Sequence, residues 1–224
     1  MHKKIYSILI MCFLSTALFS GCGAPDSSDM LSQYLKQNAH SEESIPSAKE
    51  KFASLLSNRK WVLSHTNENI KDPSDVTFMT ADIDGDNTNE LIMYHSTCMA
   101  DMSLTIVKYS EKTGEITCEL VGCDHGGFAG YSADKKMFFT SSAHMGSSYS
   151  AAYEYKNNEP YLTKVCTWND YQSYSYNMNS QYTFNGTKMS QSEYRDNINN
   201  IMSDVRYGNV EFHPITSYNI SRYL

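Results

Sequence analysis

The sequence predicts a mainly β fold of the α+β class: an antiparallel β-meander with the outline of a partial propeller, flanked by an N-terminal and a C-terminal helix. The prediction depends on two observations. From residue 76 onward, apolar and polar residues alternate in short runs, which is the period of a β-strand. Turn-forming residues separate these runs at 111–114, 157–160 and 185–186, as expected for strands joined by hairpins.

Helical periodicity marks two segments, residues 47–63 and residues 190–205. The first begins with Ser47 and carries Glu50 three residues later, which is the pattern of a capping box. Ser190 or Ser192 is in a position to cap the second. Strands are expected at 76–81, 91–95, 103–109, 115–121, 137–141, 149–155, 161–168 and 181–184, and turns at Gly126, Gly127 and Gly146.

The start of the chain has the pattern of a secretory signal. Two lysines precede an apolar run over residues 5–19, which is shorter than the ~20 apolar residues that a membrane-spanning helix needs. The run ends in a serine, a glycine and Cys22. Residues 18–22 resemble the bacterial lipobox, although Phe19 stands where that motif usually has an aliphatic residue.

The lipobox resemblance implies export and a lipid on the thiol of Cys22, which would hold the protein on the outer face of the cell membrane. On this interpretation residues 1–21 are a signal peptide, residues 22–45 a lipidated flexible tether, and residues 46–224 a single β-rich domain. The alternative is an ordinary secretory signal that happens to contain this cysteine.

The chain is acidic, with 18 basic and 25 acidic side chains and a formal net charge of −7. Removal of the signal deletes two lysines and no acid, so the net charge becomes −7 − 2 = −9. An acidic surface argues against binding of nucleic acid through a basic patch, and we expect no nucleic-acid partner.

An acidic loop is the segment that carries the most specific chemistry. Residues 82–90 read Asp-Ile-Asp-Gly-Asp-Asn-Thr-Asn-Glu, and calcium takes six to eight oxygen ligands. We expect Gly85 and Asn87 to adopt positive φ, so that alternate side chains converge on one ion. The expected ligands are the carboxylates of Asp82, Asp84, Asp86 and Glu90 and the backbone carbonyl of Thr88. A solvated acidic turn without an ion is the alternative.

The acidic loop differs from an EF-hand, because the twelfth residue is Met93 and a strand is expected where a helix should follow. It resembles the strand–loop–strand calcium motif of integrin-type FG-GAP repeats. Residues 78–92 and the closing segment 214–220 also look like recurring segments of exported Firmicutes lipoproteins. These resemblances imply an architecture and a calcium ion, and no reaction.

Four cysteines remain after the signal and the lipidated residue are set aside: Cys98, Cys118, Cys123 and Cys166. An even number outside the cytoplasm predicts two disulfides. If Tyr109 faces Glu115 across a hairpin, pairing of Cys98 with Cys123 is weakly favoured, which leaves Cys118 for Cys166. A zinc site formed by Cys118, Cys123 and His125 is the alternative.

The function that these observations favour is a binding or interaction module of the cell envelope that meets a cell-wall polymer, a peptide or an envelope protein. The alternative is an envelope hydrolase whose catalytic groups are dispersed in the sequence. A cleft that joins His125 or His144 to a carboxylate would favour the hydrolase. The aromatic segment 168–182 fits either function, but ordinary core packing is the favoured interpretation of its side chains.

Overall fold

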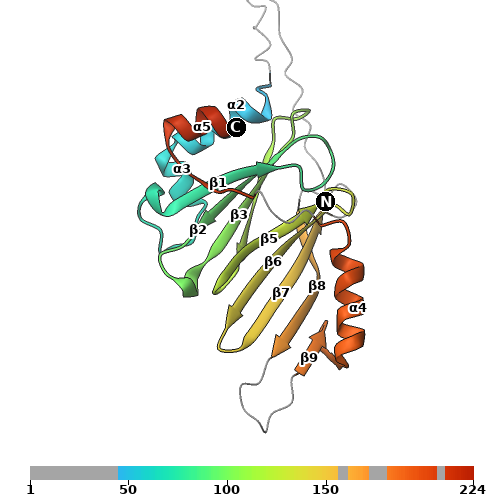
Figure 1. The fold of residues 1–224 in the computed structure, drawn as a ribbon. Coiled ribbons are helices and arrows are strands. Elements are labelled where there is room, and N and C mark those ends of the chain that lie inside the picture. Colours follow the sequence, from blue (N-terminus) through green and yellow to red (C-terminus); the bar gives the residue numbers. More distant parts are fainter. Residues whose placement is uncertain (1–44, 156–160, 172–180, 206–209) are drawn as a thin grey trace, which may run out of the picture. The chain divides into compact units, whose positions relative to one another are not determined.

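The protein is described by a computed structural model that covers residues 45–155, 161–171, 181–205 and 210–224. In these residues the fold is mainly β, with two antiparallel sheets and flanking helices, which confirms the predicted α+β class (Figure 1). The turn expected at 157–160 lies outside the described residues. No helix in the described part of the chain is long and apolar enough to span a membrane.

The predicted N-terminal helix is two helices, α2 (Ala48–Ser57) and α3 (Arg59–Ser64). The capping box is confirmed, because the Ser47 hydroxyl accepts from the Glu50 N–H and the Glu50 carboxylate accepts from the Ser47 N–H. Asn58 separates the two helices: its backbone is extended, and its side-chain oxygen accepts from the Trp61 N–H at 3.1 Å. An asparagine side chain that competes for backbone donors in this way favours a helix start over a helix interior.

The first sheet has the strand order β11-β1-β2-β3-β4. Its strands are β1 (Val76–Ala81), β2 (Glu90–His95), β3 (Ser103–Tyr109), β4 (Ile116–Gly122) and β11 (His213–Pro214). Two short 3₁₀ helices, η1 (Pro73–Asp75) and η2 (Met99–Asp101), precede β1 and β3. In the β3–β4 hairpin Tyr109 faces Ile116, so the expected pairing with Glu115 is wrong by one residue. The left-handed backbone of Gly114, at φ 74°, and its bond to the Ser110 carbonyl set this register.

The second sheet has the order β10-β9-β8-β7-β6-β5. Its strands are β5 (Gly126–Ser132), β6 (Met137–His144), β7 (Ser147–Tyr155), β8 (Leu162–Tyr171), β9 (Gln181–Phe184) and β10 (Thr187–Met189). The turn expected at Gly126 and Gly127 is wrong, because both residues belong to β5. A Cβ at Gly126 would overlap the Ser141 carbonyl oxygen, so this glycine permits close approach of two strands.

The C-terminal helix is confirmed as α4 (Gln191–Met202), which Ser190 caps through a box with Glu193. After it, β11 pairs with β1, and α5 (Ser217–Tyr223) begins at the Thr216 cap. The closing segment 214–220 therefore adds the edge strand of the first sheet and a last helix.

Three buried clusters hold these elements together. The first joins α2, α3 and α5 to one face of the first sheet, through residues such as Phe52 and Phe78. The second joins the opposite face, including Ile92, to Phe138 of the second sheet. The third packs α4 against the other face of the second sheet, around Phe139. Figure 1 shows α2, α3 and α5 beside β1–β3, and α4 beside β8 and β9.

Candidate cation site

The acidic loop (Asp82–Glu90) connects two paired strands. The register of β1 and β2 places Ala81 opposite Glu90, so both ends of the loop are fixed by the sheet. Within it, Gly85 has φ 71° and Asn87 has φ 68°, which confirms the two left-handed positions expected from the sequence. A Cβ at Gly85 would lie 2.8 Å from the Ala133 carbonyl oxygen, so the loop contacts the connection between β5 and β6.

The three aspartates of the loop converge. Asp82, Asp84 and Asp86 each offer a carboxylate oxygen, and these oxygens lie within 4.8 Å of one another. Asp84 is buried, Asp82 is half-buried and Asp86 is exposed. Hard cations prefer oxygen ligands of this kind, so the chemistry of the three side chains fits a metal ion. Glu90 does not belong to this group of mutually close ligands.

Backbone amides orient these carboxylates. Asp82 accepts from the N–H groups of Gly85 at 2.7 Å, Asp86 at 3.2 Å and Asn87 at 3.1 Å. Asp84 accepts from the Asp86 N–H, and Asp86 accepts from the Thr88 N–H at 2.8 Å. These backbone donors therefore orient the three carboxylates, and the Thr88 N–H is one of them.

Glu90 is almost completely buried, at 1% exposure. One carboxyl oxygen accepts from the Ile83 N–H at 3.0 Å. Burial, followed by the negative charge of Asp84, raises the pKa of Glu90 to about 8. In this state the carboxyl group keeps its proton at neutral pH, so Glu90 would have to lose that proton before it could act as an anionic ligand.

Lys108 is the residue that the sequence interpretation missed. Its ammonium group contacts the Asp84 carboxylate, lies 3.0 Å from Asp86 Oδ2 and lies 3.7 Å from Glu90 Oε1. It also lies over the Tyr155 ring, 4.9 Å from the centroid. Partial burial disfavours its charge, but the bonds to Asp84 and Asp86 outweigh burial and raise the pKa of Lys108.

The position of Lys108 corrects one step of the sequence interpretation, which took an ion as the explanation for closely spaced carboxylates. The chain supplies a positive charge itself. A metal ion that binds here must compete with this ammonium group for Asp84 and Asp86. The β2–β3 register pairs Leu91 with Val107 and, extended by one residue, sets Lys108 opposite Glu90. No short stretch of the sequence indicates this neighbour.

No protein-family model, curated protein or solved structure matches this chain. The assignment of a function therefore depends on the residues of the chain itself.

The four cysteines carry free thiols in this structure. Burial raises the pKa of Cys118 to about 11 and that of Cys123 to about 12, so both thiols are protonated at neutral pH. A protonated thiol is a poor nucleophile and a poor metal ligand. In the described part of the chain, no group of three metal-ligating side chains contains Cys118, Cys123 or His125, so the structure does not support the alternative zinc site. The two disulfides stay a prediction.

The aromatic segment from Trp168 to Tyr182 is described only in part. Trp168 is buried and packs against Phe139, with ring centroids 6.4 Å apart. Tyr182 packs against Tyr194 of α4 at 5.1 Å. The described aromatic side chains of this segment thus belong to the third core cluster. Residues 172–180, with two further tyrosines, lie outside the described residues.

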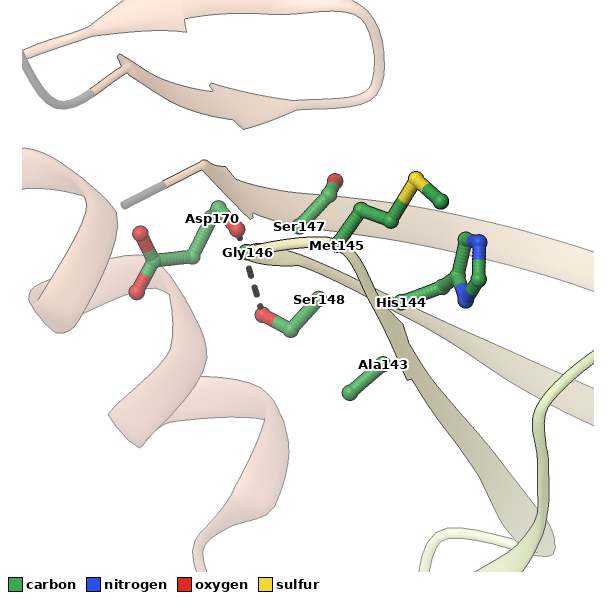
Figure 2. A pocket seen from close by; sticks show the side chains of 7 residues that line it. All are labelled: Ala143, His144, Met145, Gly146, Ser147, Ser148 and Asp170. Atoms are coloured by element: carbon green, nitrogen blue, oxygen red, sulfur yellow. Dashed lines mark hydrogen bonds between the residues drawn. The ribbon is translucent and has the colours of Figure 1, made fainter. Parts of the chain in front are cut away.

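A hollow of about 280 Å³ at the tip of the β6–β7 hairpin contains His144 and Asp170, the histidine–carboxylate combination expected of a hydrolase. Figure 2 shows the imidazole and the carboxylate directed to opposite sides of the hairpin. The Asp170 charge instead acts on Tyr194 of α4, whose pKa rises to about 12, mainly because of burial. The two groups therefore do not form an acid–base pair in this arrangement.

Proposed function

We propose that this chain is an exported lipoprotein of the bacterial cell envelope whose β-rich domain is stabilised by one calcium ion in the acidic loop, and that the domain serves as a binding module. The observation that carries the calcium site is the convergence of Asp82, Asp84 and Asp86 within 4.8 Å, with Gly85 and Asn87 in the left-handed conformation that this loop needs.

Calcium suits this ligand set better than magnesium does. The carboxylates sit on a short loop with fixed strand ends, and calcium accepts irregular oxygen geometries at ~2.3–2.6 Å, whereas magnesium demands a near-octahedral shell at ~2.0–2.1 Å. Two further ligands would come from the Thr88 carbonyl and from Glu90 after loss of its proton. Calcium would displace Lys108 from Asp84 and Asp86.

A binding role is favoured over hydrolysis for two reasons. The His144 imidazole and the Asp170 carboxylate point away from each other. The Cys123 thiol, which lies two residues before the candidate base His125 in the sequence, is buried and protonated. A cell-wall polymer or an envelope protein is the partner class that a surface-tethered module would meet.

A thermal melt of the whole chain in detergent tests the calcium site. At a calcium concentration of a hundred times Kd, a single site stabilises the native state by about 2.7 kcal/mol. Extracellular calcium modules often have Kd values of ~10⁻⁴–10⁻³ M, so millimolar calcium is needed. The melting temperature should rise relative to chelator, and magnesium should have a smaller effect.

Two variants make the calcium test specific. Asp86→Ala removes an exposed ligand and should abolish most of the calcium response. Asp75→Asn, which changes an exposed aspartate of η1 outside the loop, should keep the full response. Equal melting temperatures of the wild-type chain in chelator and in millimolar calcium would show that the loop is an acidic turn and no metal site.

The lipid anchor has a separate test. Cys22→Ala removes the only thiol that the lipobox resemblance assigns to acylation. The variant should lose firm membrane attachment on cell fractionation, because stable anchoring depends on buried acyl chains. Unchanged cleavage and unchanged attachment of the variant would show that Cys22 is not lipidated.

A further inference from the structure

The histidine pair, His125 and His144, lies where β5 begins and β6 ends. The N–H of His125 donates to the Met99 carbonyl at 2.6 Å, and its carbonyl accepts from the Ala143 N–H at 3.4 Å. His144 is the last residue of β6 and faces Ser147 across the hairpin. Backbone pairing thus fixes both residues, although neither was expected from the sequence to meet the other.

The two imidazole rings contact each other. Their centroids are 4.0 Å apart and their planes are inclined by 36°. Among the described residues, neither ring donates or accepts a hydrogen bond through a ring nitrogen. Two nitrogens bound to one tetrahedral ion at ~2.0–2.1 Å lie roughly 3.3 Å apart. A shared ion requires the two side chains to rotate until one nitrogen of each ring reaches this spacing, and the ring centroids already lie 4.0 Å apart.

Other side chains around the histidine pair are already engaged. The Ser147 hydroxyl donates to Asn169 Oδ1 at 3.1 Å, and the Ser148 hydroxyl donates to the Asp170 carbonyl at 3.4 Å. The Asp170 carboxylate points away from His144, as Figure 2 shows. Met145, at the turn, is 84% exposed and carries a thioether next in sequence to His144. The ligand atoms that remain without a hydrogen bond among the described residues here include the imidazole nitrogens and the Met145 thioether.

We propose that His125 and His144 bind a divalent transition-metal ion of the class that takes imidazole nitrogen, such as Zn²⁺ or Cu²⁺. Imidazole suits zinc, copper and nickel, whereas calcium prefers oxygen. Both rings bind the ion in their neutral form, and water or the Met145 thioether fills the open positions. The site is exposed at a hairpin tip and exchanges its ion with the surrounding solution. It is independent of the calcium site in its ligands and in its position in the chain.

Calorimetric titration of the whole chain in detergent with Zn²⁺ tests this site. The titration uses a Cys98→Ser background, because Cys98 is the exposed thiol of the described residues and could bind zinc itself. We expect one bound Zn²⁺ per chain. His144→Gln and His125→Asn should each weaken binding roughly a hundredfold, since the second of two joined ligands acts at a high effective concentration. Asparagine is chosen at position 125 because it tolerates the φ of 60° found there.

Two controls separate this site from other zinc ligands. His65→Gln changes a histidine that stacks on Trp61 and should leave Zn²⁺ binding unchanged. Asp86→Ala removes a calcium ligand and should also leave Zn²⁺ binding unchanged. The proposal is overturned if the background chain binds no Zn²⁺, or if the double variant of His125 and His144 binds it as tightly as the background chain does.

Discussion

The acidic loop and the histidine pair differ in whether their ligand atoms already have hydrogen-bond or ion-pair partners within the chain. In the loop, backbone N–H groups and Lys108 occupy the carboxylates of Asp82, Asp84 and Asp86. In the histidine pair, the ring nitrogens have no hydrogen-bond partner in the described part of the chain. A metal ion must therefore displace an existing cation at the loop, whereas it meets free donors at the hairpin tip.

This difference affects stability. At the loop the chain itself provides both hydrogen bonds and positive charge, so a bound ion would add only the difference in stabilisation between itself and Lys108. The histidine pair depends on strand pairing for its geometry, and its side chains add little to stability. Substitution of either histidine side chain should therefore change stability little, whereas substitution of Lys108 at the loop should change it through the loss of charge.

Gly126→Ala should cause the largest loss of stability, because it disturbs the two strands that hold the histidine pair. A Cβ here would overlap backbone atoms of Ser141 and Ser142, which cannot yield without separating β5 from β6. We expect the free energy of unfolding to fall by about 3 kcal/mol or more, at the upper end of overpacking effects. Urea denaturation measures it.

Gly122→Ala is the matched control for this variant. A Cβ at Gly122, the last residue of β4, meets nothing within 4 Å, and the change should alter stability by less than about 0.5 kcal/mol. The Gly126 variant should also lose the zinc site, because His125 and His144 separate. Equal stability of the two alanine variants would contradict the close approach of β5 and β6.

His95 provides the next test, because it is a buried histidine whose two ring nitrogens both have hydrogen-bond partners, unlike those of the histidine pair. It is completely buried, its Nε2 lies 2.9 Å from the Thr105 hydroxyl, and its Nδ1 accepts from the Asn67 N–H at 3.5 Å. Burial lowers the pKa of His95 to about 4, although the charge of Asp101 acts in the opposite direction. The unfolded chain protonates this histidine near pH 6.5, so it binds more protons than the folded chain between pH 6.5 and pH 4.

Stability should therefore be unaffected by His95 above pH 6.5 and should fall as the pH decreases to 4, by up to about 3 kcal/mol. His95→Gln should reduce this part of the pH dependence in denaturation measurements at pH 7 and pH 4.5. His65→Gln, which changes a partly exposed histidine, is the matched control for the substitution itself. The same fall in stability for wild type and the His95 variant would show that other groups cause it.

Several features of this fold and of the acidic loop can be predicted from the sequence alone. Most strands, the capping box at Ser47, the helix cap at Ser190 and the left-handed residues Gly85 and Asn87 follow from local patterns, and the structure confirms them. The α+β class follows from the same patterns. For the site, the sequence located Asp82, Asp84 and Asp86, because alternate side chains of a tight loop converge through local geometry alone.

The features that the sequence interpretation missed depend on contacts between distant segments. Strand β5 reads as a turn because two glycines start it, and only the neighbouring strand β6 explains why Gly126 is a glycine. Lys108 reaches the acidic loop because β3 pairs with β2, and the histidine pair meets because β6 returns beside His125. Cross-strand register is not encoded in any short window of sequence, so these partners required the structure.

Lys108→Met tests what the lysine charge contributes at the acidic loop. The variant leaves the buried Asp84 carboxylate without its cation, so we expect the metal-free chain to lose about 2 kcal/mol, less than for a fully buried pair because Lys108 is 20% exposed. Calcium affinity should rise roughly tenfold, since no ammonium group competes for the carboxylates. Denaturation in chelator measures the first effect and calcium titration the second.

Two substitutions control the lysine experiment. Lys108→Arg keeps the positive charge and should keep the low calcium affinity. Lys164→Met removes a lysine that lies over Tyr153 in the second sheet, 5.5 Å from the ring centroid, and should leave calcium affinity unchanged. A lower calcium affinity of Lys108→Met would mean that the lysine supports the ion and does not compete with it.

The smallest predicted difference is the one between Gly85→Ala and Gly186→Ala, and it measures how closely the acidic loop contacts the second sheet. Alanine at φ 71° is destabilised by roughly 1–2 kcal/mol through backbone strain alone. Gly186→Ala provides this strain without a contact, because Gly186 has φ 74° and a Cβ there meets nothing within 4 Å. At Gly85 the Cβ would also lie 2.8 Å from the Ala133 carbonyl oxygen, a backbone atom that cannot rotate away.

We therefore expect Gly85→Ala to be less stable than Gly186→Ala by about 1 kcal/mol in urea denaturation. Equal losses would show that the loop can move away from the β5–β6 connection, and the acidic loop would then be stabilised by its own hydrogen bonds and Lys108 alone.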